Sequence, residues 1–307
     1  MPFVEEKTGV VEARGGYRWV WLGWGIWLGC SPAPAPTAPP LPPPISPPSS
    51  SLPVVHNIPK SLDISEDEPP PDPRPPPLEH PDPFLFLQVQ GFGDAVVSLA
   101  LGARERRPIL VAAHGNYDTP ESQCWIWREI VGDDGFVLCP RGVVRPDSPS
   151  RNDLRYEYVS NQQLEKEIEA GVEALDLAYP DHVDAEAIVF TGFSQGAIMG
   201  ASIMARRPER YPRAVLIEGG QRVWYPAHAK AFSEGGGQRI LWACGQWECH
   251  RQAVEAAKVL EKFQIASRVV FSKGEGHTYG GGVADEIRAA FSWVVQGDER
   301  WARETRH

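Results

Sequence analysis

The residues with the clearest chemical potential form the run GFSQG at positions 192–196, which contains the pattern G-x-S-x-G around Ser194. An apolar stretch at 187–190 comes before it and small or apolar residues up to 204 follow it, which predicts a strand, a sharp turn and a helix. Such a turn lifts a serine hydroxyl above the edge of a sheet, and glycine is needed where side chains have no room. We therefore interpret Ser194 as a candidate nucleophile that needs a base, an acid and an oxyanion hole from other segments.

The elements that must position this serine alternate between strands and helices. Apolar runs predict strands at 84–90, 95–101, 108–115, 135–140, 187–190, 213–220, 239–245 and 267–273. Helical patterns occupy 120–130, 162–177, 195–204, 226–232, 251–263 and 284–295. This alternation predicts an α/β fold: a three-layer sandwich with a mostly parallel eight-stranded sheet, an antiparallel hairpin at its start and no large cap domain.

This arrangement around a G-x-S-x-G turn resembles the α/β-hydrolase superfamily over roughly residues 84–295. Within that superfamily, the chain is most similar to the dienelactone-hydrolase, carboxylesterase and polyhydroxybutyrate-depolymerase-like serine esterases, which share a His-Gly loop and little or no lid. The resemblance implies cleavage of small-molecule or polymeric carboxylic esters through an acyl-enzyme. It also implies that the acid and then the histidine follow the nucleophile along the chain.

His277 is the candidate base that this order selects. It lies in the run GEGHTYG directly after the last predicted strand, where the superfamily places its histidine, and its glycines allow the loop to bring the ring over Ser194. Among the other histidines after Ser194, His228 lies inside a predicted helix and His307 is the last residue of a polar tail. The role of His277 would be to take the serine proton and return it to the leaving group.

The acid is expected to be a glutamate, because no aspartate lies between Ser194 and His277. Two glutamates follow predicted strands directly. The resemblance favours Glu248, which comes after the penultimate strand, where the superfamily usually has its acid; Glu218, after the preceding strand, is the alternative.

Two backbone N–H groups are expected to form the oxyanion hole. One is that of Gln195, which follows the nucleophile at the start of a helix. By similarity to other His-Gly loops, the second is that of Asn116, with Gly115 allowing close approach and His114 bracing the loop.

The first 30 residues predict an export signal. Residues 19–29 are apolar, arginines precede them and Cys30 follows, which is the length and order of a signal segment rather than of a membrane span. The ending Trp27-Leu28-Gly29-Cys30 resembles a bacterial lipobox, although Trp27 departs from the usual aliphatic residue. The resemblance implies lipidation of Cys30 and a membrane-anchored lipoprotein of the cell envelope, on its periplasmic or cell-surface face. An ordinary secretory signal or an uncleaved anchor is the alternative.

Most of the 31 prolines follow, at 31–83, and predict a disordered tether in extended polyproline geometry. The hydrolase-like domain is then expected at 84–298 and a polar tail at 299–307. A net charge of −10 without a basic block argues against nucleic acid as a partner, and no glycine-rich phosphate loop indicates a nucleotide. The absence of metal-ligand spacings predicts no metal or other cofactor.

The cysteines after Cys30 form an even set in a chain predicted to be exported: Cys124, Cys139, Cys244 and Cys249. Disulfides are therefore expected, and four cysteines allow three pairings, among which the spacing does not choose.

Two alternatives to an esterase stay open. A serine peptidase of the same superfamily has the same triad. A non-catalytic scaffold that binds a cell-envelope ligand would keep the fold without the reaction.

Overall fold

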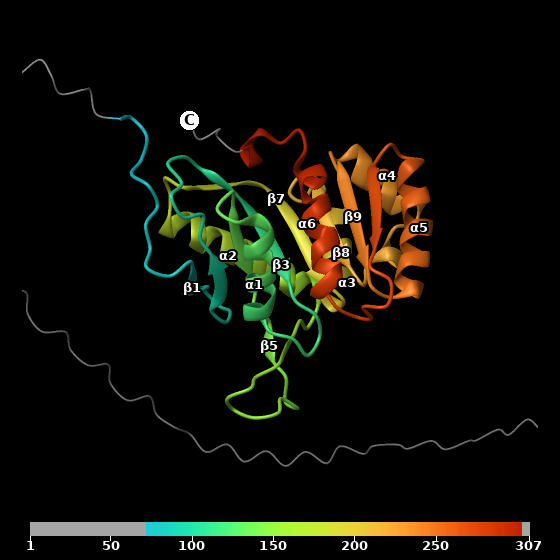
Figure 1. The fold of residues 1–307 in the computed structure, drawn as a ribbon, viewed down its shortest axis with the longest axis horizontal. Coiled ribbons are helices and arrows are strands. Elements are labelled where there is room, and N and C mark those ends of the chain that lie inside the picture. Colours follow the sequence, from blue (N-terminus) through green and yellow to red (C-terminus); the bar gives the residue numbers. More distant parts are fainter. Residues whose placement is uncertain (1–71, 303–307) are drawn as a thin grey trace, which may run out of the picture. The chain divides into compact units, whose positions relative to one another are not determined.

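The computed structural model describes residues 72–302, which form a main sheet with helices on both of its faces (Figure 1). The strand order is β1-β2-β4-β3-β7-β8-β9-β10. The pairs β1–β2 and β2–β4 are antiparallel, and the other neighbours are parallel, which confirms the predicted mostly parallel eight-stranded sheet with its opening hairpin. The strands of this sheet are β1 (Phe84–Leu87), β2 (Ala95–Ser98), β3 (Arg107–Ala113), β4 (Phe136–Cys139), β7 (Val183–Phe193), β8 (Arg213–Ile217), β9 (Arg239–Cys244) and β10 (Ala266–Phe271).

Within residues 72–302, six α-helices cover the sheet and complete the predicted three layers. On one face lie α1 (Pro120–Val131) and α6 (Gly281–Val295). On the other lie α2 (Asn161–Ala178), α3 (Gln195–Arg206), α4 (Pro226–Glu234) and α5 (Trp247–Glu261). Each face has its own apolar core, because consecutive strand residues point to opposite faces. No cap domain interrupts the described residues.

Helix α3 approaches the sheet closely because its inner face is built from small residues. A Cβ at Gly200 would lie 1.9 Å from Cε1 of Phe190 on β7, so only glycine fits there. Ala197 and Ala201 on the same helix are fully buried. This packing holds the residue that precedes α3 at the edge of the sheet.

The register of the parallel strands brings the ends of β3, β7, β8 and β9 to one level. Ala113 pairs with Gly192, Phe193 with Ile217, and Ile217 with Ala243. The residues that follow these strand ends therefore share one edge of the sheet, the usual place for a site in an open α/β fold.

A small second sheet lies in the segment at 141–159. Its strands are β5 (Val143–Val144) and β6 (Tyr156–Glu157), paired antiparallel. The hairpin extends away from the three layers (Figure 1).

Packed residues extend several positions beyond both predicted boundaries of the domain, 84 and 298. Leu78, inside the predicted tether, is buried, and its backbone accepts a hydrogen bond from Gly102 and donates one to Ala103. At the other end, Trp301 of the short helix η2 (Glu299–Trp301) is buried against Phe291. Apolar side chains inside segments of proline-rich or polar composition explain both differences.

The predicted signal segment with Cys30 and residues 31–71 of the predicted tether lie outside the described residues. Between residues 72 and 302, none of the helices combines the length and the apolar composition that crossing a membrane requires.

Candidate active site

Ser194 occupies a strained turn between β7 and α3, as the pattern G-x-S-x-G predicts. Its φ of +51° lies in a region that residues other than glycine rarely adopt. A Cβ at Gly192 would lie 2.5 Å from the backbone carbon of Gly196, and one at Gly196 would lie 2.4 Å from the carbonyl oxygen of Ala113. The backbone N–H of Ser194 donates to Ile217 of the neighbouring β8 at 2.9 Å, which anchors the turn to the sheet.

His277 lies beside this turn, in the loop between β10 and α6. The centre of its ring is 4.8 Å from that of Phe193, the residue before Ser194. Its Nδ1 lies 3.3 Å from Oε2 of Glu218. An imidazole whose Nδ1 faces a carboxylate presents Nε2 for proton transfer.

Glu218 is the carboxylate that the fold delivers to His277. It follows β8 with a φ of +52°, and 1% of its side chain is exposed. Its Oε1 accepts hydrogen bonds from the backbone N–H groups of Gly245 and Gln246, at 2.5 and 2.9 Å. Both carboxylate oxygens are therefore held, and the carboxylate can orient the imidazole.

The loop after β3 lies against the serine turn. A Cβ at Gly115 would come within 2.7 Å of Cδ1 of Phe193 and 3.5 Å of Cβ of Ser194, and the N–H of Gly196 donates to the carbonyl of His114. The backbone N–H groups of Asn116 and Gln195 donate no hydrogen bond within residues 72–302.

His114 holds this loop in place through buried contacts. It is fully buried, its ring stacks on Tyr158 at 4.4 Å, and its nitrogens face the carbonyls of Gly115 and Arg141. Burial lowers the pKa of His114. Its position matches the bracing role expected for it.

Comparison with solved structures supports the fold. An acylaminoacyl peptidase in complex with Z-Gly-Gly-Phe-chloromethyl ketone aligns with a TM-score of 0.50 and 12% identity, over 72% of this chain and 42% of that chain. The described fold therefore corresponds to less than half of that peptidase's length. The protein has an α/β-hydrolase fold.

Two further similar structures are a carboxylesterase from Bacillus cereus and a thermostable esterase. The first aligns with a TM-score of 0.45 and 19% identity, over 65% of this chain and 93% of that chain. The second aligns with a TM-score of 0.47 and 17% identity, over 69% of this chain and 62% of that chain. No protein-family model matches the sequence, and no curated protein does so significantly.

In this α/β-hydrolase fold, the prediction that Glu248 contacts His277 is wrong. Helix α5 begins at Trp247, four residues earlier than predicted, so Glu248 lies in its first turn with 58% of its side chain exposed. There it pairs with Arg251 at 2.6 Å and accepts from Gln252. Hydrogen bonds from these two residues lower the pKa of Glu248 to about 2.

Two disulfides resolve the pairing of the four cysteines. Cys124 of α1 bonds to Cys139 of β4, and Cys244 bonds to Cys249 at the start of α5. The second disulfide closes the short loop that holds Glu218. The described residues contain one cluster of potential metal ligands, formed by Glu218 with these last two cysteines, but both sulfurs belong to the disulfide.

Large exposed apolar side chains accompany the loops at this edge of the α/β-hydrolase fold. Tyr225 and Trp247, which follow β8 and β9, are 51% and 66% exposed, and Ile198 in the first turn of α3 is 52% exposed. A hollow of about 300 Å³ is lined by Trp224, Tyr225 and the middle of α5, among others. A second hollow, of about 820 Å³, lies along α2, and none of the candidate site residues lines it.

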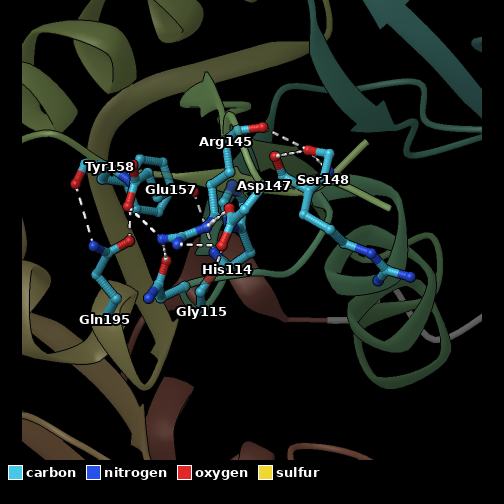
Figure 2. Close-up of polar contacts among 10 residues, drawn as sticks. His114, Gly115, Arg145, Asp147, Ser148, Glu157, Tyr158 and Gln195 are labelled. Carbon is cyan, nitrogen blue, oxygen red and sulfur yellow. Dashed lines mark hydrogen bonds and ion pairs between the residues drawn. The ribbon is translucent and has the colours of Figure 1, made fainter. Parts of the chain in front are cut away.

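The sequence does not reveal one group of residues around the site. Arg145 on the β5–β6 hairpin contacts Asn116, and the side chain of Gln195 bonds to Tyr158 (Figure 2). The segment at 141–159 does contain several arginines, together with aspartates and tyrosines that can pair with them.

Proposed function

We propose that this protein hydrolyses carboxylic esters through an acyl-enzyme, with Ser194 as nucleophile, His277 as base and Glu218 as acid. The observation that carries the proposal is the contact of His277 with the buried Glu218, beside a serine in a strained strand–helix turn. Acyl transfer to a serine needs a nucleophile, a histidine base and a carboxylate that orients the histidine.

In the acylation step, the proton of the Ser194 hydroxyl passes to Nε2 of His277 while the oxygen attacks the ester carbonyl. Glu218 stabilises the imidazolium that forms. The tetrahedral intermediate collapses, the bond to the alcohol breaks, and the alcohol leaves with the proton from Nε2. Water then attacks the acyl-serine with its proton going to the same nitrogen, which releases the carboxylic acid and restores the hydroxyl.

The negative charge on the carbonyl oxygen needs two donors that lie near Ser194 and make no other bond. The backbone N–H of Gln195, at the positive end of α3, is one. The backbone N–H of Asn116 is the other, because Gly115 lets its loop approach the serine turn. Neither N–H needs to break an existing hydrogen bond to receive the oxyanion.

An ester fits this site better than a peptide. The edge with Ser194 carries exposed apolar side chains such as Ile198 and Trp247 and is not enclosed by a cap domain within the described residues. These features suit a substrate with an apolar acyl group or a polymeric ester. The similar peptidase is more than twice as long as the aligned region.

Labelling with a fluorophosphonate, followed by turnover of p-nitrophenyl esters of increasing chain length, tests the proposal. An esterase reacts at Ser194 and turns over the esters, while Ser194→Ala does neither. Turnover of peptidyl p-nitroanilides in preference to the esters would instead identify a peptidase. Absence of both labelling and turnover in the wild-type protein would identify a binding scaffold.

We also propose that the protein is exported and anchored to a membrane through lipidated Cys30. The support is the apolar run at 19–29, which ends at Cys30 before the proline-rich segment. The mature protein should partition into detergent and carry acyl groups on Cys30, and Cys30→Ser should release it or block its processing. Mature protein that still contains residues before Cys30 would contradict this.

A further inference from the structure

The β5–β6 hairpin contacts both residues that the proposed function assigns to the oxyanion hole. These residues, Asn116 and Gln195, belong to segments far apart in the chain, one after β3 and the other at the start of α3. The hairpin is a third segment. It contacts the side chain of Asn116 through the side chain of Arg145, and the side chain of Gln195 through the backbone of Tyr158 (Figure 2).

Arg145 makes the contact to Asn116. Its Nη1 donates to Oδ1 of Asn116 at 2.6 Å and to Oε2 of Glu157 at 2.7 Å. Its other two nitrogens, Nε and Nη2, donate to the two carboxylate oxygens of Asp147, at 2.9 and 3.0 Å. This forked pairing leaves the guanidinium little freedom to rotate, so Nη1 is aimed at Asn116.

The backbone around Asn116 is joined to the same hairpin. The N–H of Tyr117 donates to the carbonyl of Tyr156, and the N–H of Tyr156 donates to the carbonyl of Asp118, both at 3.0 Å. The loop with Asn116 is thus paired to β6 like a short strand, and Arg145 holds the Asn116 side chain against the hairpin.

The contact to Gln195 uses the residue that follows β6. The N–H of Tyr158 donates to Oε1 of Gln195 at 2.9 Å, and Nε2 of Gln195 donates to the carbonyl of Tyr158 at 3.2 Å. The oxygen and the nitrogen of the amide are thus both bonded to the backbone of Tyr158, which fixes the side chain of Gln195. The first residue of α3 is therefore tied to the hairpin as firmly as Asn116 is.

We propose that Arg145 is a positioning residue of the oxyanion hole, which holds Asn116 at a set separation from Gln195 through the β5–β6 hairpin. The inference rests on the proposed function, because it assigns Arg145 a role in the same reaction. A donor contributes fully only when it already points to the position of the oxyanion, so displacing it should lower the rate of the chemical step rather than the binding of the ester.

Arg145→Met tests this, because methionine keeps the apolar stem and removes the guanidinium. We expect kcat to fall on the order of tenfold with KM within about twofold of wild type, since misplaced groups lose part of the rate that correct positioning supplies. The affinity for a trifluoromethyl ketone, which forms a tetrahedral adduct with the serine, should fall in proportion to kcat/KM.

Asn116→Ala tests the same contact from the other side, because alanine retains the backbone N–H and removes Oδ1. It should reproduce the loss of kcat, and the double variant Arg145→Met/Asn116→Ala should be no slower than either single variant. Arg155→Met is the matched control. Arg155 lies over the ring of Tyr117 as Arg145 does, at 5.8 and 5.6 Å, but pairs with Asp153 and does not contact Asn116. Its kcat should stay near that of wild type.

Unchanged kcat in a folded Arg145→Met protein would overturn the inference, as would losses that multiply in the double variant. If Arg145→Met fails to fold, unchanged kcat in Asn116→Ala would overturn it equally. These outcomes are distinct from failure of the proposed function, in which the wild-type protein itself neither hydrolyses esters nor reacts with a fluorophosphonate.

Discussion

Glu218 and His277 are separated by 59 positions in the chain and meet at 3.3 Å between Oε2 and Nδ1. The carboxylate is buried at the end of β8, whereas the imidazole is 46% exposed in the loop after β10. Because both oxygens of the buried carboxylate are bonded, Glu218 has a fixed position and can orient the more exposed ring of His277. The proposed reaction depends on this pair and on the serine beside it.

Glu218→Gln should lower kcat on the order of 10³-fold, because the amide keeps the shape but no longer stabilises the imidazolium or fixes its tautomer. Steady-state hydrolysis of a p-nitrophenyl ester measures this. Glu248→Gln is the matched control, since Glu248 is an exposed partner of Arg251, and it should leave kcat within about twofold. The reverse ranking of the two variants would remove Glu218 from the triad.

Ser194→Ala should lower ester turnover on the order of 10³-fold or more while the melting temperature changes little. Ser194→Gly should also be inactive. Its free energy of unfolding should be about 1 kcal/mol higher than that of Ser194→Ala, because glycine adopts a φ of +51° without strain. Denaturant unfolding of the three proteins measures the difference. Equal stability of the glycine and alanine variants would show that the turn stores no strain.

Replacing both Cys244 and Cys249 with serine should lower kcat several-fold. The disulfide closes the loop whose N–H groups hold Glu218, and a loosened loop positions the acid less well. The double serine variant of Cys124 and Cys139 is the control: it should lower stability by about 3 kcal/mol for a loop of 15 residues without changing kcat in the folded protein. A loss of kcat of the same size in both variants would contradict a specific role of the Cys244–Cys249 disulfide.

Glu167 makes the stability of the fold depend on pH. It is buried in α2, and its Oε1 accepts from the backbone N–H groups of Arg141 and Gly142 at the base of the hairpin. Burial raises the pKa of Glu167, so the folded state binds the proton of this carboxyl more tightly than the unfolded state does. The contribution of Glu167 to stability therefore falls as the pH rises above the pKa that Glu167 has in the unfolded chain.

Glu167→Gln removes this titration and keeps an oxygen to accept both hydrogen bonds. The free energy of unfolding of wild type relative to the variant should therefore decrease as pH rises through and above about 4.5. Urea unfolding at several pH values measures this difference. A relative stability of wild type that increases with pH would contradict the assigned direction.

Much of this site follows from local features of the sequence. The strained turn at Ser194 is encoded by two glycines and the apolar residues around them, within one short stretch of chain. The central strands, such as β3, β4 and β8, follow from continuous apolar runs, because a strand buried on both faces of a sheet has no polar side. His277 is identified by its glycine-flanked loop after the last strand, once the resemblance supplies the order of the triad.

The tertiary structure alone decides the acid and the parts that hold it. Glu218 and Glu248 both follow strands, and the difference between them is a φ of +52° at one residue and a helix that starts four positions early. The contact of Arg145 with Asn116 joins residues 29 positions apart, and no pattern of apolar residues in the sequence predicts that they meet. Periodicity encodes which face of an element is buried, whereas the meeting of two polar side chains depends on how distant segments pack. For this reason the sequence by itself determined the α/β fold, the serine turn and the candidate histidine, and only the folded chain decided which carboxylate reaches that histidine.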